Sequence, residues 1–206
     1  MSISLAPRIY LASRSPRRRE LLAQMGVHFE TLLFRVPPRE DAEVDETPLV
    51  SEDPLDYVQR VSRAKAEHGL RLVLWRHLLA RPILAADTTV ECRGEILGKP
   101  VDEADARRML ELLSGSRHRV LTAVSLAWSG HVETVVSESL VQFRDLEEAE
   151  ISRYIASGEP MDKAGAYGIQ GRAGMFVSRL EGSYTGVMGL PLCETGELLK
   201  KAAYPL

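Results

Sequence analysis

Cysteine is scarce in this chain: of its 206 residues only Cys92 and Cys193 are cysteines, and they lie far apart. Structural zinc sites and disulfide scaffolds need several cysteines at short, characteristic spacings. The sequence therefore argues against both kinds of scaffold, and such sparing use of cysteine fits a reducing cytoplasm.

Long hydrophobic runs and an excess of positive charge are also missing. No apolar stretch is long enough to span a membrane, and Pro7 and Arg8 interrupt the apolar residues near the start of the chain. The formal net charge is −3, which gives no electrostatic basis for general nucleic-acid binding. We expect a cytoplasmic protein whose partners are neither membranes nor nucleic acids.

Two common nucleotide-binding motifs are absent as well. The chain has no G-x-x-x-x-G-K-[ST] loop and no G-x-G-x-x-G segment after a strand, which argues against ATP motors and dinucleotide-binding enzymes. Hydrophobic residues make up 45% of the chain, and no break in composition divides it. We therefore predict one domain over residues 1–206, long enough to bury a large core.

Helical and strand patterns alternate along the chain, which predicts an α/β fold with two lobes and a cleft between them. Gly69 is expected to end the second helix, and Asp145 with Glu148 has the spacing of a capping box. A proline-rich acidic loop is expected at 37–54. The expected helices are 16–25, 54–69, 102–115, 145–156 and a C-terminal helix to about 201. The expected strands are 9–12, 27–36, 82–86, 119–128 and 132–143.

The start of the first helix concentrates positive charge. Ser15 is expected as the N-cap and Pro16 as the first helical residue, with arginines at positions 14 and 17–19. The helix dipole disfavours cations at this end, so their presence indicates a site for an anion such as phosphate. A solvated helix face is the alternative, and we assign Arg14 and Arg19 to it.

Asp87 directly follows the apolar run 82–86. We expect it at the carboxyl end of a buried strand, the edge where open α/β sheets bind ligands. A hairpin turning at Arg93-Gly94 would return Lys99 to the same edge. A role as a turn or cap is the alternative for Asp87, although no helix follows it.

The last third of the chain is rich in glycine. Tight turns between short strands explain several of these glycines, and glycine also permits positive φ angles and close approach of the backbone to a ligand. The side chains in this stretch with chemistry to offer are Asp162, Lys163 and Gln170. The basic helix start, Asp87 and the spare acid Glu46 supply cations, carboxylates for a divalent metal and a base, which are the parts that phosphoanhydride hydrolysis requires. Further cations and one amide complete this set: Lys65, Lys99, Lys163 and Gln170.

At these residues the chain resembles the Maf family of nucleoside triphosphate pyrophosphatases. The resemblance runs nearly end to end, which makes it specific. It rests on LASRSPRRRELL (11–22), AADTTV (85–90), GEILGKP (94–100), LSGSRHRVLTAV (113–124), DKAGAYGIQG (162–171) and GSYTGVMGLPLCET (182–195).

The resemblance implies an elongated α/β fold with a mixed sheet, similar to inosine triphosphatases, and a nucleotide cleft between two lobes. It also implies a homodimer that hydrolyses a nucleoside triphosphate to the monophosphate and pyrophosphate with Mg²⁺ or Mn²⁺. Asp87 matches the proton acceptor, and Glu46 with Asp87 matches the metal-binding acids. The phosphate-side positions match Ser13, Arg17, Arg18, Lys65, Lys99 and Lys163.

Within the family the chain resembles the branch that acts on dTTP and UTP, at Arg17, Thr88 and Gln170. A glutamine amide both donates and accepts hydrogen bonds, so it suits the O4 and N3–H edge of uracil or thymine. Two alternatives remain open: a pyrophosphatase of 7-methyl-GTP or aberrant purine nucleotides, and a nucleotide-binding regulator of septum formation.

Overall fold

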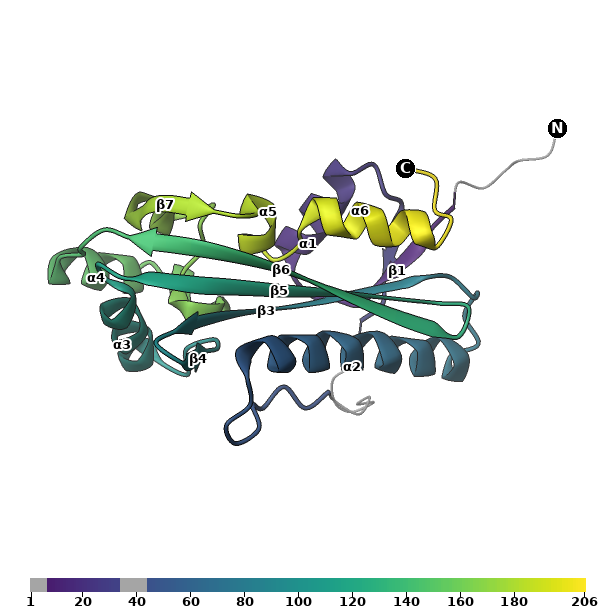
Figure 1. Ribbon diagram of the computed structural model, residues 1–206, viewed down its shortest axis with the longest axis horizontal. Helices are drawn as coiled ribbons and strands as arrows, with labels where there is room; N and C mark the ends of the chain where they lie inside the picture. Colours follow the sequence, from purple (N-terminus) through teal and green to yellow (C-terminus); the bar gives the residue numbers. More distant parts are fainter. Residues whose placement is uncertain (1–6, 34–43) are drawn as a thin grey trace.

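One mixed β-sheet runs through the protein. The computed structural model describes residues 7–33 and 44–206, and within these ranges seven strands form a sheet in the order β2-β1-β3-β5-β6-β7, with β4 paired to β3. Figure 1 shows β3, β5 and β6 running along an elongated molecule. The strands are β1 (Ile9–Leu11), β2 (Phe29–Thr31), β3 (Ile83–Cys92), β4 (Glu95–Leu97), β5 (Arg117–Trp128), β6 (His131–Phe143) and β7 (Val177–Glu181).

The strand pairing is parallel where β1 meets β2 and β3, and antiparallel elsewhere. This confirms the predicted α/β fold with a mixed sheet, including the β5–β6 hairpin. The expected strand at 27–36 is shorter: β2 ends at Thr31, and residues 34–36 lie outside the described residues.

Helices cover both faces of the sheet (Figure 1). Helix α2 lies along one face, α1, α5 and α6 lie on the other, and α3 and α4 pack together at one end. None of the helices in the described ranges is both long and apolar enough to cross a membrane. The helices are α1 (Pro16–Gln24), α2 (Pro54–Trp75), α3 (Glu103–Leu113), α4 (Glu148–Ile155), α5 (Tyr184–Val187) and α6 (Leu192–Lys201).

Separate apolar layers fill the spaces between these helices and the sheet. The layer beneath α1 and α6 contains Leu22, Leu84, Leu126 and Leu199. The layer beneath α2 contains Val58, Val61, Leu121 and Ala123. A further cluster at the α3–α4 end contains Leu110, Phe143, Tyr167 and Phe176.

Helix α2 continues through Gly69 instead of ending there. Gly69 is buried, and a Cβ atom at this position would lie 2.9 Å from Cγ2 of Ile83 on β3. The glycine therefore lets the helix approach the sheet closely, and its effect on helix propensity is overridden by packing. As a result Lys65 lies within the body of α2, not near its end.

The segment from α4 to β7 also differs from expectation in two places. The capping box of α4 is formed by Glu147 and Glu150, two residues later than the predicted pair. The glycine-rich stretch forms mainly short 3₁₀ helices, not short strands: η1 (Glu159–Asp162), η2 (Ala164–Ala166) and η3 (Arg172–Phe176), followed by β7. Gly165 has a positive φ of 67°, a backbone conformation that glycine adopts without steric cost.

Candidate active site

A pocket of about 1230 Å³ opens where β3 has no neighbouring strand on one side. Strand β1 pairs with β3 only at Ile83 and Leu84, and β4 pairs with it only from Val90 to Cys92. Residues 85–89 therefore form an open edge among the described strands. Because the pocket meets this edge, it is lined by side chains from both faces of β3, namely those of Asp87, Thr88 and Thr89.

The position of Asp87 corrects the prediction from the sequence. Asp87 lies in the middle of β3, not at its carboxyl end, because Thr88, Thr89 and Val90 continue the strand. The β3–β5 pairing is unbroken across this point, with Asp87 opposite Ala123. Asp87 nevertheless reaches the pocket because the neighbouring strand β1 stops early.

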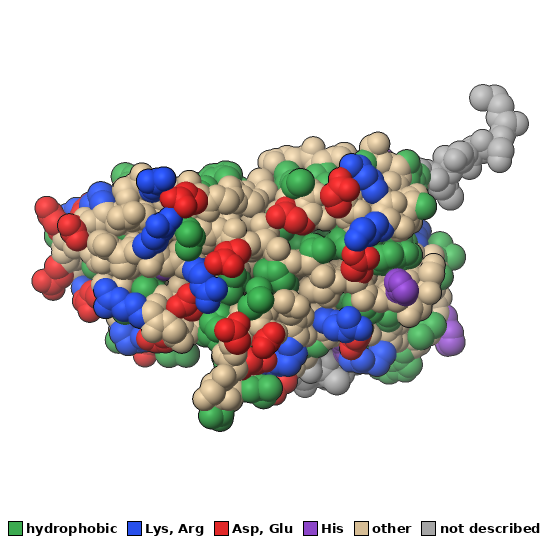
Figure 2. Space-filling model, viewed as in Figure 1, with side chains coloured by type: hydrophobic (Ala, Val, Ile, Leu, Met, Phe, Trp, Pro, Cys, Tyr) green, Lys and Arg blue, Asp and Glu red, His purple; other side chains and the backbone are tan. Residues whose placement is uncertain are grey.

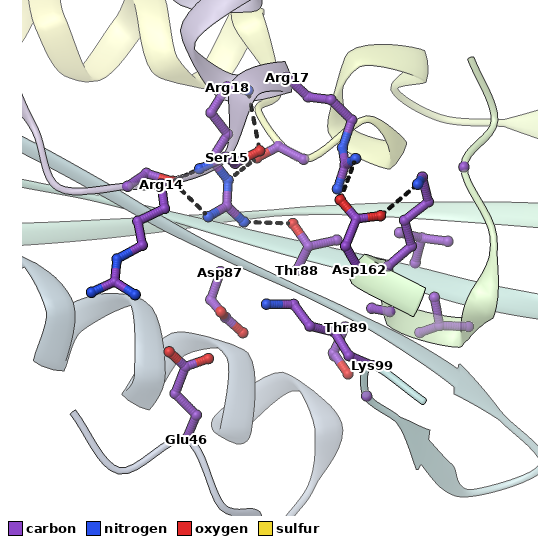
Figure 3. Close-up of a pocket in the computed structure, with 18 of the residues that line it drawn as sticks. Arg14, Ser15, Arg17, Arg18, Glu46, Asp87, Thr88, Thr89, Lys99 and Asp162 are labelled. Atoms are coloured by element: carbon purple, nitrogen blue, oxygen red, sulfur yellow. Dashed lines mark hydrogen bonds and ion pairs between the residues drawn. The ribbon is translucent and has the colours of Figure 1, made fainter. Parts of the chain in front are cut away.

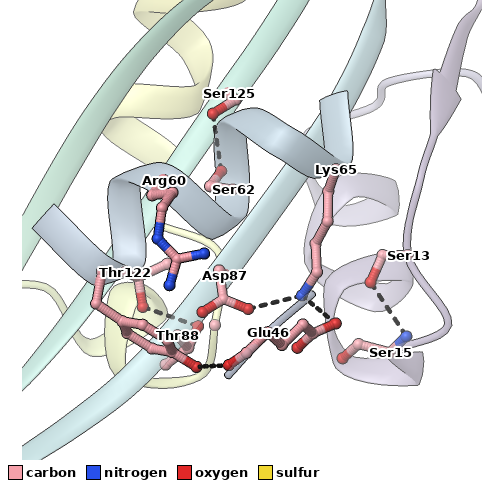
Figure 4. A network of polar contacts seen from close by, with 12 residues as sticks. Ser13, Ser15, Glu46, Arg60, Ser62, Lys65, Asp87, Thr88, Thr122 and Ser125 are labelled. Carbon is pink, nitrogen blue, oxygen red and sulfur yellow. Dashed lines mark hydrogen bonds and ion pairs between the residues drawn. The ribbon is translucent and has the colours of Figure 1, made fainter. Parts of the chain in front are cut away.

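Lys65 forms ion pairs with the two carboxylates predicted to bind metal, those of Asp87 and Glu46. Its Nζ lies 2.8 Å from Oδ1 of Asp87 and 2.9 Å from Oε1 of Glu46 (Figure 4). The side chains of Lys65 and Asp87 are only 12% and 10% exposed, whereas that of Glu46 is 53% exposed. The Tyr57 hydroxyl donates to the Glu46 carbonyl at 2.9 Å, which ties the loop carrying Glu46 to α2.

The first turn of α1 holds Arg18 over the opposite wall of the pocket. Ser15 caps the helix as predicted, accepting from the Arg18 N–H. The Arg18 guanidinium donates to the Gly189 carbonyl at 2.8 Å, to Thr88 Oγ1 at 3.1 Å and to Ser13 Oγ at 3.4 Å (Figure 3). These acceptors are all neutral, so no ion pair with a described residue compensates its charge. Burial lowers the pKa of Arg18, and the Asp87 carboxylate opposes this shift.

Arg17 points toward a different part of the pocket. Its Nη1 lies 3.3 Å from Oδ2 of Asp162, and the other oxygen of Asp162 lies 2.6 Å from Nζ of Lys163 (Figure 3). Lys163 Nζ also donates to the Glu159 carbonyl at 2.5 Å. Asp162 therefore forms ion pairs with two of the predicted phosphate-binding cations at once, and one positive charge remains in excess.

Lys99 and Gln170 complete the predicted set, and both line the pocket with exposed side chains. Neither forms a hydrogen bond or ion pair with another described residue, so each is available to a ligand. All ten predicted site residues thus meet in one pocket. The five predicted cations fall into three groups: Lys65 between two carboxylates, Arg17 and Lys163 around Asp162, and Arg18 and Lys99 without an ion-pair partner in the described ranges.

Several residues of the pocket were missed or assigned elsewhere. Arg14 is exposed, as its assignment to the surface predicts, but it also lines the pocket (Figure 3). Thr89 lies within the AADTTV motif, where strand alternation alone would have placed it on the same face as Asp87. Tyr167 also lines the pocket, and its hydroxyl lies 2.9 Å from Nε2 of the buried His118. That contact joins residues distant in sequence, so no local pattern reveals it.

The carboxylates fit a divalent cation in their chemistry and number. Mg²⁺ prefers oxygen ligands and is often held by one or two carboxylates together with substrate phosphates. Glu46 and Asp87 supply such a pair, brought together by Lys65. No group of three or more acidic, histidine or cysteine side chains suited to a metal occurs in the described part of the chain. A metal here would therefore depend on the substrate for further ligands.

Comparisons with known proteins show similar sequences over nearly the whole chain. The model of the family described as "Maf-like protein" matches residues 8–202. A protein of Dechloromonas aromatica named dTTP/UTP pyrophosphatase is 62% identical over 96% of this chain and 98% of its own. A protein of the same name from Aromatoleum aromaticum is 57% identical over 97% of each chain.

A solved structure supports the fold independently of sequence. The Ham1 protein of Staphylococcus aureus superimposes with a TM-score of 0.52 at 14% identity, covering 95% of this chain and 99% of that one. At this identity the likeness concerns the fold alone. The family model and the two relatives each extend over nearly the whole chain, and together they establish that this protein belongs to the Maf family.

Proposed function

We propose that this protein hydrolyses UTP and dTTP to the monophosphate and pyrophosphate. The observation that carries the proposal is the contact of one ammonium group, Lys65 Nζ, with both Asp87 and Glu46 on the wall of a pocket rich in cations. Relatives that are 57% and 62% identical are named dTTP/UTP pyrophosphatases, which supports the same reaction here. Removal of such nucleotides, including modified forms, from the cellular pool is the role we infer.

In this proposal Asp87 accepts the proton of a water that attacks the α-phosphorus. Its Oδ1 accepts a hydrogen bond from Lys65, and its Oδ2 forms no hydrogen bond with another described residue. The second oxygen is thus left to receive a proton. Arg18 and Lys99 would offset the negative charge of the triphosphate, since neither is paired with a described carboxylate.

A divalent cation, Mg²⁺ or Mn²⁺, is part of the proposal, with Glu46 and Asp87 as its protein ligands. When bound, it would neutralise phosphate charge and polarise the phosphoryl oxygens. The residues themselves carry the rest: Lys65 holds the two carboxylates together, and Glu46 comes from a loop that Tyr57 fixes to α2.

The base would bind at the other end of the pocket, near Gln170 and Arg17. The amide of Gln170 can accept from N3–H and donate to O4 of uracil or thymine. Thr88 would contribute indirectly, because its hydroxyl is already engaged by Arg18 at 3.1 Å and lies 3.0 Å from Thr122 Oγ1. Adenine presents the opposite pattern, an amino donor beside a ring-nitrogen acceptor, so its polar groups would be left unpaired by this arrangement of the Gln170 amide. Guanine has an acceptor and an N–H donor in the same order, so discrimination against it would come from the larger size of the purine ring.

We also infer a cytoplasmic homodimer. An exposed apolar patch at the end of α2 supports an interface there; its members are Leu74, Trp75, Leu78 and Leu79, of which the first two are 74% and 67% exposed. Sedimentation equilibrium of the wild type and of Trp75→Glu tests this part separately. A wild type that sediments as a monomer at micromolar concentration would contradict it.

The variant Asp87→Asn tests the assignment of the base. We expect hydrolysis of UTP to fall by about 10²- to 10⁴-fold, the usual contribution of a general base, with UTP binding retained in calorimetry. The matched control is Glu95→Gln, which removes another ion-paired carboxylate, that of Glu95 with Arg108, outside the pocket. Equal activity of Asp87→Asn and the control would refute the role of Asp87.

A further inference from the structure

The hydroxyl group of Thr89 is buried and forms no hydrogen bond with a described residue. The residue is 1% exposed, and its Oγ1 has no hydrogen-bond partner among the described residues. Of the buried side-chain atoms in the described ranges that lack a partner, Thr89 Oγ1 is the one whose residue lines the pocket. An unpaired buried hydroxyl destabilises a protein, so its presence on the wall of a binding site calls for a ligand that pairs with it.

The sheet register places this hydroxyl on the same face of β3 as Asp87. Thr89 is opposite Leu121 and Asp87 is opposite Ala123, and both partners belong to the apolar layer beneath α2. Residues two apart on a strand lie about 7 Å from each other. Thr89 thus lines the pocket on the same face of β3 as Asp87, two residues further along the strand.

The neighbouring chemistry indicates a phosphate group as the partner. Lys99, two residues beyond β4, lines the same pocket without a charged partner among the described residues. Asp87, Thr89 and Lys99 are all labelled in the pocket in Figure 3. A hydroxyl donor and an ammonium group around one space suit an anionic oxygen. Of the α2 residues that cluster with Leu121, Val58 and Val61 are apolar, and the Tyr57 hydroxyl donates to the Glu46 carbonyl.

We infer that Thr89 is a substrate-binding residue whose hydroxyl donates a hydrogen bond to the polyphosphate of the bound nucleotide. This inference rests on the proposed function for the identity of the nucleotide. Binding a polyphosphate would satisfy the hydroxyl, so the residue costs stability in the free protein and contributes affinity in the complex. Its role differs from that of Thr88, whose hydroxyl is engaged within the protein.

Two variants at this position separate binding from packing. Thr89→Val replaces the hydroxyl by a methyl group of similar size, whereas Thr89→Ser keeps the hydroxyl and removes the methyl group. For Thr89→Val we expect kcat/KM for UTP to fall by at least about tenfold, as for loss of a hydrogen bond to a charged group. Its melting temperature without ligand should equal or exceed that of the wild type, because the unpaired hydroxyl is gone. Thr89→Ser should keep kcat/KM within about twofold.

A binding assay that needs no turnover keeps this inference separable from the proposed function. Inorganic pyrophosphate with Mg²⁺ should raise the melting temperature of the wild type and of Thr89→Ser more than that of Thr89→Val. This readout stands even if the wild type hydrolyses none of the nucleotides tested, which would overturn the proposed function alone. The inference is overturned if Thr89→Val retains both pyrophosphate stabilisation and turnover. It is equally overturned if Thr89→Val loses them together with a fall in its melting temperature without ligand, which would indicate a packing role.

Discussion

Asp162 holds Arg17 across the pocket: Oδ2 of Asp162 lies 3.3 Å from Nη1 of Arg17, joining two segments 145 residues apart in the sequence. Asp162 binds Lys163 with its other oxygen. Burial alone would raise the pKa of Asp162, but the interactions with Lys163 and Arg17 outweigh this effect, so the pKa is lowered. Asp162 thus neutralises one of the two positive charges beside it, whereas Arg18 and Lys99 have no ion-pair partner in the described part. The ion pair keeps the Arg17 guanidinium on Asp162 and away from phosphates.

Removal of the Asp162 charge should therefore weaken base selectivity. We expect Asp162→Asn to lower the ratio of kcat/KM for UTP to that for GTP by about twofold to fivefold, the size of a partly exposed ion pair. The physical reason is that Arg17, no longer held, becomes available to phosphates in the wrong orientation. In a double-mutant cycle with Arg17→Gln, the Asp162 substitution should have no further effect. An equal effect in both backgrounds would show that Asp162 does not act through Arg17.

A second prediction concerns the buried His118. Burial lowers its pKa to about 4, from the ordinary value of 6.5, so the folded protein binds this proton less readily than the unfolded chain. The contribution of neutral His118 to the free energy of unfolding is fully present above pH 6.5 and is lost as the pH falls toward 4. The loss should reach about 2–3 kcal/mol by pH 4.5.

Urea unfolding of the wild type and of His118→Gln at pH 7.0 and 4.5 isolates this contribution. Glu52 and Glu150 have pKa values lowered to about 2 by Arg60 and Arg144, so they also reduce stability at low pH, but equally in both proteins. The wild type should lose more stability between the two pH values than the variant does. Identical losses would contradict the assignment to His118.

A third prediction compares alanine substitutions at two glycines whose φ angles lie in the left-handed region. Gly26 and Gly165 have φ angles of 72° and 67°, but a Cβ at Gly26 would meet no atom within 4 Å. A Cβ at Gly165 would lie 2.8 Å from Cγ2 of Val90. Gly26→Ala should cost about 1–2 kcal/mol from backbone strain alone. Gly165→Ala should cost about 1–3 kcal/mol more from overpacking.

Gly165→Ala should also reduce activity, because Gly165 lies in the segment that carries Lys163 and Gln170 into the pocket. Thermal unfolding and UTP hydrolysis of the two variants provide the measurement. Equal destabilisation by the two substitutions would show that the contact with Val90 is relieved without cost.

A fourth prediction concerns the divalent cation. Removal of metal with EDTA should abolish hydrolysis, and added Mg²⁺ or Mn²⁺ should restore it. Glu46→Gln should raise the Mg²⁺ concentration needed for half-maximal activity, because one of the two carboxylate ligands becomes a neutral amide. The control is Glu67→Gln, since Glu67 pairs with Arg63 at 2.9 Å on α2 and does not line the pocket. Full activity in EDTA would contradict the metal assignment.

The sequence predicted most reliably those features that depend on neighbouring residues. Ser15 caps α1 as predicted, because a cap needs only a side chain and the N–H groups of the next turn. Gly69 misled the prediction because the close approach of α2 to Ile83 is a tertiary contact. The Arg17–Asp162 pair was missed for the same reason.

The structure brings Asp87 into the pocket with the other predicted residues, but the prediction that it ends the strand was wrong. The apolar run indicated a buried strand, but whether it continued past Asp87 depended on pairing with β5, which local sequence does not reveal. That Asp87 lines a pocket depended in turn on how far β1 extends. Eight of the ten predicted site residues lie in the quoted motifs, Glu46 and Lys65 were assigned from the family resemblance outside them, and the structure brings all ten into one pocket.

The identity of the products of UTP hydrolysis tests the central claim most directly. Wild-type protein with Mg²⁺ and a panel of UTP, dTTP, CTP, GTP, ATP and 7-methyl-GTP should be analysed for nucleotide products and for released pyrophosphate. Attack at the α-phosphorus predicts UMP and pyrophosphate in equal amounts, with UTP and dTTP hydrolysed fastest. Release of UDP and inorganic phosphate, or a preference for a purine nucleotide, would contradict the proposed function.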